Sequence, residues 1–191
     1  MNTHRLFLSM SLYLFIAPLS FADAPVQAYL NVRSIPGQSK DADHPNWIEI
    51  NNYGMGSSRN DHDPHSSTPA AFQDFTVTKR RDKAASPQLR KACHSGDTIS
   101  SVTLSVYRTD LRMEIVQMRF TDVRITSVRR VSGFGSKAIE EITFGYSTII
   151  WIYKRPTADG GVVTTSNGWD VVNNRPLTAP PDVSARLITM K

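Results

Sequence analysis

The sequence predicts a mainly β protein, an antiparallel β-barrel or sandwich with one short flanking α-helix. Three observations support this fold class. Apolar and polar residues alternate with a period of two in many segments of the 191-residue chain, which is typical of strands that bury one face. A single segment, 86–95, carries the signals of a helix. Strands and helices do not alternate along the chain, as they would if the sheet were parallel.

The expected strands follow one another with short turns between them. In the clearest case, Phe75 and Val77 alternate with Thr76 and Thr78, so that one face of the strand is apolar. A glycine-containing turn at 133–136 separates two of the later strands. The expected strands are 28–32, 47–53, 75–79, 102–107, 116–121, 123–131, 142–153, and 162–165 together with 169–172.

The helix follows the strand at 75–79. Ser86 is a good N-cap, and Pro87 is favoured at the first helical position. Gly96 supplies the left-handed residue that ends many helices. The helix is too short to persist alone in water, so we expect it to lie against the sheet. The residues that share its apolar stripe are Leu89, Ala92 and Cys93.

One expected strand is apolar on both faces. Residues 149–153 read Ile-Ile-Trp-Ile-Tyr, whereas a barrel wall with one wet face needs apolar residues at every second position only. The second face is therefore covered by the helix or another part of the same chain, or else by a neighbouring subunit. The pattern leaves both alternatives open.

Several short motifs occur together in a fixed order between about Tyr29 and Asn173. Through them the chain resembles the haemolysin-coregulated protein (Hcp) family, the tube subunit of the bacterial type VI secretion system. The motifs are Gly37-Gln38-Ser39-Lys40-Asp41 with His44 and Trp47-Ile48, Tyr53-Gly54-Met55, Phe75 to Lys79 with Asp82-Lys83, Ser86-Pro87 with Leu89 and Ala92-Cys93 to Gly96, and Gly168-Trp169-Asp170.

The resemblance implies an Hcp-like barrel that works as a structural subunit and is neither an enzyme nor a cofactor-binding protein. Members of the family form six-membered rings that stack into a tube. The tube is propelled from the cell inside a contractile sheath, behind a spike, and small effectors are carried in its lumen. The implied partners are therefore other copies of the chain, sheath and spike proteins, and secreted effectors. The long polar segment 54–71 corresponds to an extended loop that reaches the next ring.

Candidate site residues follow from this resemblance and from the surface pattern. Position in the family places Asn51 and Asn52 on the strand that lines the lumen. The two-faced strand and a basic cluster supply candidate contacts between subunits, because ring assembly buries different patches of each subunit. The candidate ring-interface residues are Ile149, Trp151, Tyr153, Arg80 and Arg81.

The two ends of the chain depart from the family pattern. Residues 1–22 resemble a signal peptide, with a basic start, an apolar run at 6–18 and small residues before a cut at Asp23. Either the true start lies near Val26 or Leu30, or the chain is an exported relative that binds an effector or a polyanion in the periplasm or outside the cell. The apolar run is too short for stable membrane insertion. The folded domain is expected at 23–174, with a flexible tail at 175–191.

Composition favours no other function class. The net charge of +5 is modest, and its basic clusters lack the interleaved aromatics of a nucleic-acid surface, so no nucleic-acid partner is expected. Cys93 is the single cysteine, so no internal disulfide can form, and a buried structural role is expected for it. His62 and His65, flanked by Asp61 and Asp63, lie in a loop without ordering neighbours, so no metal site is expected.

Overall fold

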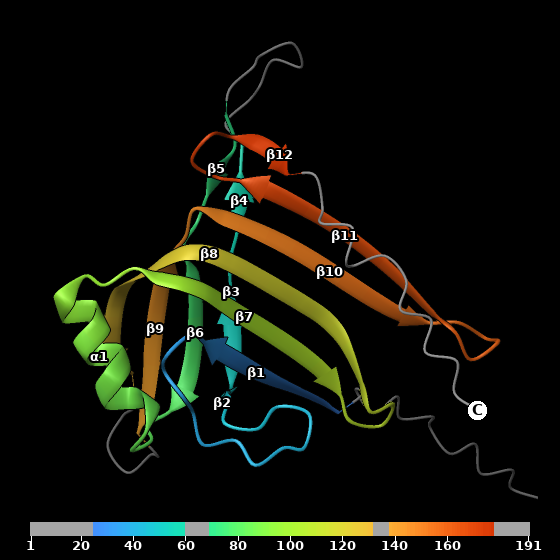
Figure 1. Cartoon of the computed structure of the whole chain (residues 1–191), viewed down its shortest axis with the longest axis horizontal. Coiled ribbons are helices and arrows are strands. Elements are labelled where there is room, and N and C mark those ends of the chain that lie inside the picture. Colours follow the sequence, from blue (N-terminus) through green and yellow to red (C-terminus); the bar gives the residue numbers. More distant parts are fainter. Residues whose placement is uncertain (1–24, 60–68, 132–137, 178–191) are drawn as a thin grey trace, which may run out of the picture.

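The computed structural model describes residues 25–59, 69–131 and 138–177, and it confirms a mainly β fold with one short helix (Figure 1). The elements, in chain order, are β1 (Val26–Val32), β2 (Ile48–Ile50), β3 (Asn52–Gly54), β4 (Ser57–Ser58), β5 (Ala71–Phe72), β6 (Phe75–Arg80), α1 (Ala85–Ser95), β7 (Ile99–Arg108), β8 (Met113–Arg130), β9 (Ile139–Gly145), β10 (Thr148–Pro156), β11 (Val162–Asp170) and β12 (Arg175–Leu177).

The strands close into a barrel through antiparallel pairs. In one direction the order is β8, β7, β1 and β2, and in the other it is β8, β9, β6 and β3. The two arms meet because β2 and β3 are consecutive in the chain. At their junction the N–H of Asn51 donates to the carbonyl of Thr78 in β6, with an N to O distance of 2.7 Å.

Strand β8 is part of the barrel and also carries an extension of the sheet. Its first half pairs with β7 on one edge and with β10 on the other, whereas its second half pairs with β9. Strands β10, β11 and β12 therefore extend the sheet beyond the barrel. We call these three strands the wing. Figure 1 shows β11 and β12 on the opposite side of the barrel from α1.

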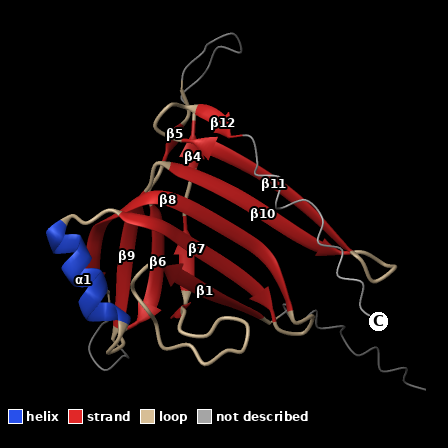
Figure 2. Cartoon of the chain, viewed as in Figure 1, coloured by secondary structure: helices blue, strands red, loops and turns tan. Residues whose placement is uncertain are grey.

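The core fills the barrel with aromatic and aliphatic side chains. Phe75 stacks between Phe120 and Phe144, at ring-centroid distances of 4.5 and 5.8 Å. Leu89 brings α1 onto this core and is 1% exposed. The helix flanks the barrel as a separate element in Figure 2. Burial of its apolar stripe, rather than its own length, holds it in helical form.

Four expected strand assignments differ from the structure. The segment 47–53 is split at Asn51, because the chain there passes from one sheet arm to the other. The segment 142–153 is two strands, β9 and β10, with a turn at Tyr146 and Ser147 between them. Conversely, 116–121 and 123–131 form one strand, β8, because Asp122 takes a left-handed φ of 49° without ending the ladder. The late segments 162–165 and 169–172 likewise merge into β11, which ends at Asp170, so Val171 and Val172 lie in the turn that follows it.

The start of α1 also differs. The helix begins at Ala85, with Ala84 as its N-cap residue, so Ser86 lies in the first turn and is not the cap. The Oδ1 atom of Asp82 accepts from the N–H groups of Ala84 and Ala85, at 2.8 and 2.6 Å, and so satisfies donors that the helix leaves free. The expected stop is confirmed, since Gly96 has a left-handed φ of 70° and donates to Ala92.

Some expectations fall beyond the described residues. The signal-like segment 1–22, the turn at 133–136, and His62 and His65 all lie there. Within the segment expected as a flexible tail, residues 175–177 form β12, which pairs with β11. Among the described residues, no helix combines the length and the apolar character needed to span a bilayer.

Candidate assembly surfaces

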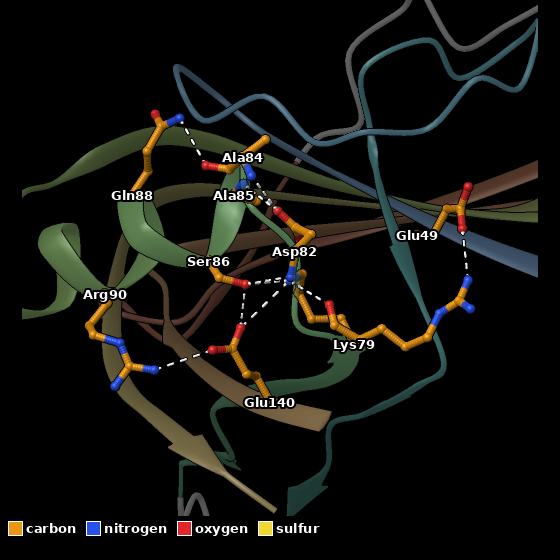
Figure 3. Close-up of polar contacts among 10 residues, drawn as sticks. Glu49, Lys79, Asp82, Ala84, Ala85, Ser86, Gln88, Arg90 and Glu140 are labelled. Atoms are coloured by element: carbon orange, nitrogen blue, oxygen red, sulfur yellow. Dashed lines mark hydrogen bonds and ion pairs between the residues drawn. The ribbon is translucent and has the colours of Figure 1, made fainter. Parts of the chain in front are cut away.

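A buried polar cluster joins α1 to the barrel (Figure 3). Its centre is Lys79 of β6, which is 1% exposed. The Nζ atom of Lys79 lies 2.5 Å from a carboxylate oxygen of Asp82 and 3.6 Å from one of Glu140. It also donates to the Ser86 hydroxyl at 3.0 Å and to the Arg80 carbonyl at 2.8 Å. The ammonium is therefore fully solvated by protein groups, which a buried charge requires.

The acidic side of this cluster is Glu140 of β9. One carboxylate oxygen accepts from the Ser86 hydroxyl at 2.5 Å, and the other accepts from the Arg90 guanidinium at 3.2 Å. Ser86 and Arg90 both lie on α1, so the cluster fixes the helix to two strands. Although partial burial opposes ionisation of Asp82, its hydrogen bonds from Lys79 and from the backbone of Ala85 hold the pKa of that carboxyl below its usual value.

The predicted basic contact residues lie beside this cluster. Arg80 is the last residue of β6, and its exposed guanidinium lies 3.5 Å from the carboxylate of Glu49 in β2 (Figure 3). Arg81 is also exposed, and its N–H donates to the carbonyl of Ala138 at 2.9 Å. Both side chains are thus at the surface, where they are free to contact a neighbouring chain.

The predicted lumen residues lie at the junction of the two barrel arms. Asn51 and Asn52 are both exposed. The Oδ1 atom of Asn52 accepts from the N–H of Tyr53 at 2.8 Å, which fixes this short side chain against its own backbone. The structure therefore brings the two asparagines together on one exposed part of the barrel wall.

The two-faced strand is covered mainly by its own chain. Ile149 is completely buried in the core and Ile152 is 2% exposed, although they lie on opposite faces of β10. Ile149 therefore offers no surface to a neighbour. Trp151 is half-buried, whereas Tyr153 is 47% exposed. Any contact of this strand with another subunit falls to Trp151 and Tyr153.

The wing also has an open edge. Strand β12 pairs with Gly168–Asp170 of β11, and no other described strand pairs with that edge along 162–167. Val162 and Val163 lie there and are 52% and 47% exposed. Natural proteins usually protect such edges with charge, proline or a bulge, because an unpaired β edge is a template for pairing with another chain.

Strands β4 and β5 lie at the end of the barrel beside β12 (Figure 1). They pair with each other. The ring centroid of Phe72 lies 6.2 Å from that of Trp169 in β11, and the Tyr146 hydroxyl donates to the Gln73 carbonyl at 3.1 Å. The base of the expected extended loop is therefore tied to the wing, whereas residues 60–68 lie outside the described residues.

The sequence analysis did not predict one row of hydrogen bonds, which runs from Asp41 through His44 to Ser105. The Nδ1 atom of His44 lies 2.8 Å from a carboxylate oxygen of Asp41, and its Nε2 lies 2.9 Å from the hydroxyl of Ser105. The order resembles a catalytic triad, but Ser105 is completely buried within strand β7 and does not stand on a nucleophile elbow. His44 also stacks on Tyr29 at 4.3 Å. These hydrogen bonds and the stacking on Tyr29 therefore hold the segment between β1 and β2 against the barrel.

The described residues hold no group of three or more histidine, cysteine, aspartate or glutamate side chains that could bind a metal ion. Cys93 is half-buried on α1. The described features that reach the surface are the wing with its open edge, the pair of strands β4 and β5, the two exposed asparagines and the pair of arginines.

Comparison with known proteins identifies the family. Residues 29–153 match the family described as "Type VI secretion system effector, Hcp". Hcp1 from Salmonella typhimurium superposes with a TM-score of 0.67 at 23% identity, covering 80% of this chain and 99% of that one. A type VI secretion system effector from Yersinia pestis gives 0.62 at 26% identity, covering 75% and 99%. Hcp2 from Salmonella typhimurium gives 0.57 at 27% identity, covering 78% and 98%.

A comparison with curated proteins gives no match. The family match nevertheless covers most of the barrel and the first part of the wing, from within β1 to within β10. It agrees with the motifs, the closed barrel and the single flanking helix. The chain belongs to the Hcp family of type VI secretion system proteins.

Proposed function

We propose that the chain is a subunit of the inner tube of a type VI secretion system and that it assembles into six-membered rings. Membership of the Hcp family supports this function. The observation that carries the assembly step is the open edge of β11, where Val162 and Val163 are exposed near Tyr153. In a ring each subunit buries two different patches, and this edge, with Trp151 and Tyr153 beside it, forms one of them.

The opposite patch of each subunit is proposed to include Arg80 and Arg81. Arg80 ends β6 and Arg81 follows it, and in the sheet two strands, β8 and β9, stand between β6 and the wing strand β10. A head-to-tail contact between such unlike patches gives a ring when the rotation between successive subunits closes, and it does not end at a dimer. A stable contact of this kind buries about 800 Å² on each partner.

Native mass spectrometry of the purified full chain tests ring assembly. The wild-type chain is expected as a hexamer. Val163→Arg places a charge at the open edge and is expected to give monomers, because a buried unpaired charge is costly. Leu111→Arg is the matched control, since Leu111 is 41% exposed in the turn between β7 and β8. A monomeric wild-type chain, or equal loss of hexamer in both variants, would contradict the proposed interface.

Ring stacking and cargo binding extend the proposal. The paired strands β4 and β5 lie at the end of the barrel beside β12, and this end of the subunit is proposed to contact the next ring. Asn51 and Asn52 are proposed to line the lumen that carries small secreted effectors. Asn52→Arg should abolish effector retention and leave the hexamer intact, whereas Gln38→Arg, at another exposed position, should change neither. If Asn52→Arg dissociates the ring, the lumen placement is wrong.

The cellular compartment in which the ring assembles separates two alternatives. We propose that the chain leaves the cell through the secretion system, with sheath and spike proteins as partners. The alternative is an exported ring that binds effectors or polyanions, and the signal-like segment 1–22 favours it. Native mass spectrometry of separated cytoplasm and periplasm distinguishes the two. A cytoplasmic hexamer whose chains start near Val26 or Leu30 supports the tube, whereas a periplasmic hexamer that starts at Asp23 supports the alternative.

A further inference from the structure

A cleft of about 420 Å³ lies beside α1, on the opposite side of the barrel from β11 and β12. Three parts of the chain form its walls: the middle of α1, the turn that follows β1, and the segment that leads from α1 into β7. Its volume falls within the range of roughly 300–1,000 Å³ that is usual for ligand sites. The lining residues are Arg33, Ser34, Ile35, Gln88, Lys91, Ala92, Asp97, Thr98, Ile99 and Ser100.

The rim of this cleft is positively charged. Arg33 and Lys91 stand on different walls, and neither forms an ion pair with another described residue. Against these two positive charges the lining offers one carboxylate, Asp97. Two unpaired cations that face one space favour an anion between them, because it would relieve their mutual repulsion.

The floor of the cleft is apolar. Ile35, Ala92 and Ile99 line it, and they are 8%, 7% and 7% exposed. Ser34 and Ser100 also line the cleft, and both residues are exposed. A free inorganic anion uses only the rim, because it gains nothing from an apolar floor. A ligand that combines a carboxylate with an apolar side chain uses both.

The cleft also continues along the helix. A second, shallower depression of about 610 Å³ is lined by Pro87, Arg90, Lys91, His94 and Ser95, so that Lys91 is common to both. Two adjoining depressions with one shared lysine suit an extended segment better than a compact small molecule. We call the two depressions together the track. The second depression adds Pro87, Arg90, His94 and Ser95, of which Arg90 already contacts Glu140, and it adds no acidic side chain.

We propose that this track binds an acidic peptide segment of a partner protein, with one carboxylate between Arg33 and Lys91 and a neighbouring apolar side chain on Ile35 and Ile99. Guanidinium groups bind carboxylates through two parallel hydrogen bonds, and ammonium groups act as point charges beside them. The residues that line the track include neither the wing edge nor Arg80 and Arg81, the two patches proposed for ring assembly. It would therefore serve a contact other than the one between neighbouring subunits of a ring.

Fluorescence anisotropy on the purified full chain tests this surface. The probe is a labelled six-residue peptide of alternating glutamate and leucine, and the neutral control peptide alternates glutamine and leucine. The variant that removes the site carries Arg33→Gln and Lys91→Gln. The matched variant carries Lys40→Gln and Arg155→Gln, which lowers the net charge equally at exposed positions elsewhere.

We expect the acidic peptide to bind the wild-type chain, with Kd at least about tenfold weaker in the site variant and little changed in the matched variant, because each charged contact is typically worth a factor of this size. The neutral peptide should not bind. Equal weakening in both variants would mean attraction to net charge alone and would overturn the site. Absence of binding, or displacement by inorganic phosphate at the same concentration as unlabelled peptide, would overturn it too.

Discussion

The Nε2 atom of His44 lies 2.9 Å from the Ser105 hydroxyl, although 61 residues separate the two in the sequence. Together with the contact between His44 and Asp41, it ties the segment between β1 and β2 to the outside of strand β7. Trp47 and Tyr107 meet the imidazole edge-on at ring-centroid distances of 5.0 and 5.4 Å, so the histidine is enclosed by aromatic rings. This arrangement makes the segment a firmly held part of the barrel wall.

Replacing His44 should therefore lower stability. His44→Ala removes both hydrogen bonds and leaves the buried Ser105 hydroxyl without its partner, so we expect a loss of about 1–3 kcal/mol in the free energy of unfolding. Urea unfolding followed by tryptophan fluorescence measures it. His94→Ala, at an exposed position on α1, should change the same quantity by less than about 0.5 kcal/mol. Equal losses in His44→Ala and His94→Ala would show that the hydrogen bonds of His44 do not stabilise the fold.

Gly37 offers a second test of the same segment. A Cβ atom at this position would lie 2.2 Å from the carbonyl oxygen of Trp47 and 2.6 Å from the backbone N of Ile48. Because both neighbours are backbone atoms, they cannot move aside cheaply. Gly37→Ala should destabilise the chain by about 1–3 kcal/mol in urea unfolding. Gly54→Ala meets no heavy atom within 4 Å, and an equally large loss there would contradict this explanation.

Lys79 should be among the most sensitive positions of the barrel. Lys79→Met keeps most of the side-chain volume but leaves the carboxylates of Asp82 and Glu140 close together without their shared cation, so we expect a loss of about 3–5 kcal/mol. Arg129→Met is the control, because Arg129 is 66% exposed in its ion pair with Glu141, and the expected loss is below about 1 kcal/mol. Comparable losses would mean that burial of the cluster is unimportant.

Stability should fall in acid partly through Asp82. Its pKa is lower in the folded chain than in the unfolded one, where it is about 3.9. The folded state therefore holds this proton less well, so the stabilisation is complete above about pH 4 and is lost as the pH falls through the folded-state pKa. Urea unfolding between pH 7 and pH 3 should show a shallower acid decline for Asp82→Asn than for the wild-type chain. If the free energy of unfolding of Asp82→Asn falls with pH as steeply as that of the wild-type chain, Asp82 does not contribute to the loss of stability in acid.

Local alternation predicted most strands because burial of one face leaves its period in the sequence. The strands at 75–79 and 102–107 were predicted in this way, and both are found, each slightly longer. Closure of the barrel at Asn51 and the continuation of β8 through Asp122 depend on pairing between distant segments. Alternation within one segment carries no information on such pairing. For this reason the break at Asn51 was not predicted, and the predicted break at Asp122 was wrong.

The buried cluster did leave a signal in the sequence. Lys79 follows Phe75 and Val77 at the same spacing of two, so the alternation already places it on the buried face of β6. A charged residue in that register implies buried acidic partners. Their identity could not be predicted, because Glu140 reaches Lys79 only through the pairing of β6 with β9. Nor could alternation show that Ile149, and not Tyr153, is the residue enclosed by the core.

Strand β8 carries one mechanical consequence. Its 18 residues form the wall of the barrel and the attachment of the wing in a single uninterrupted backbone. A force that pulls on the wing is therefore transmitted along β8 into the barrel, where rows of hydrogen bonds to β7 and β9 resist it together in shear. Because one strand runs through both parts, a push applied to one edge of the subunit is passed on to the rest of it.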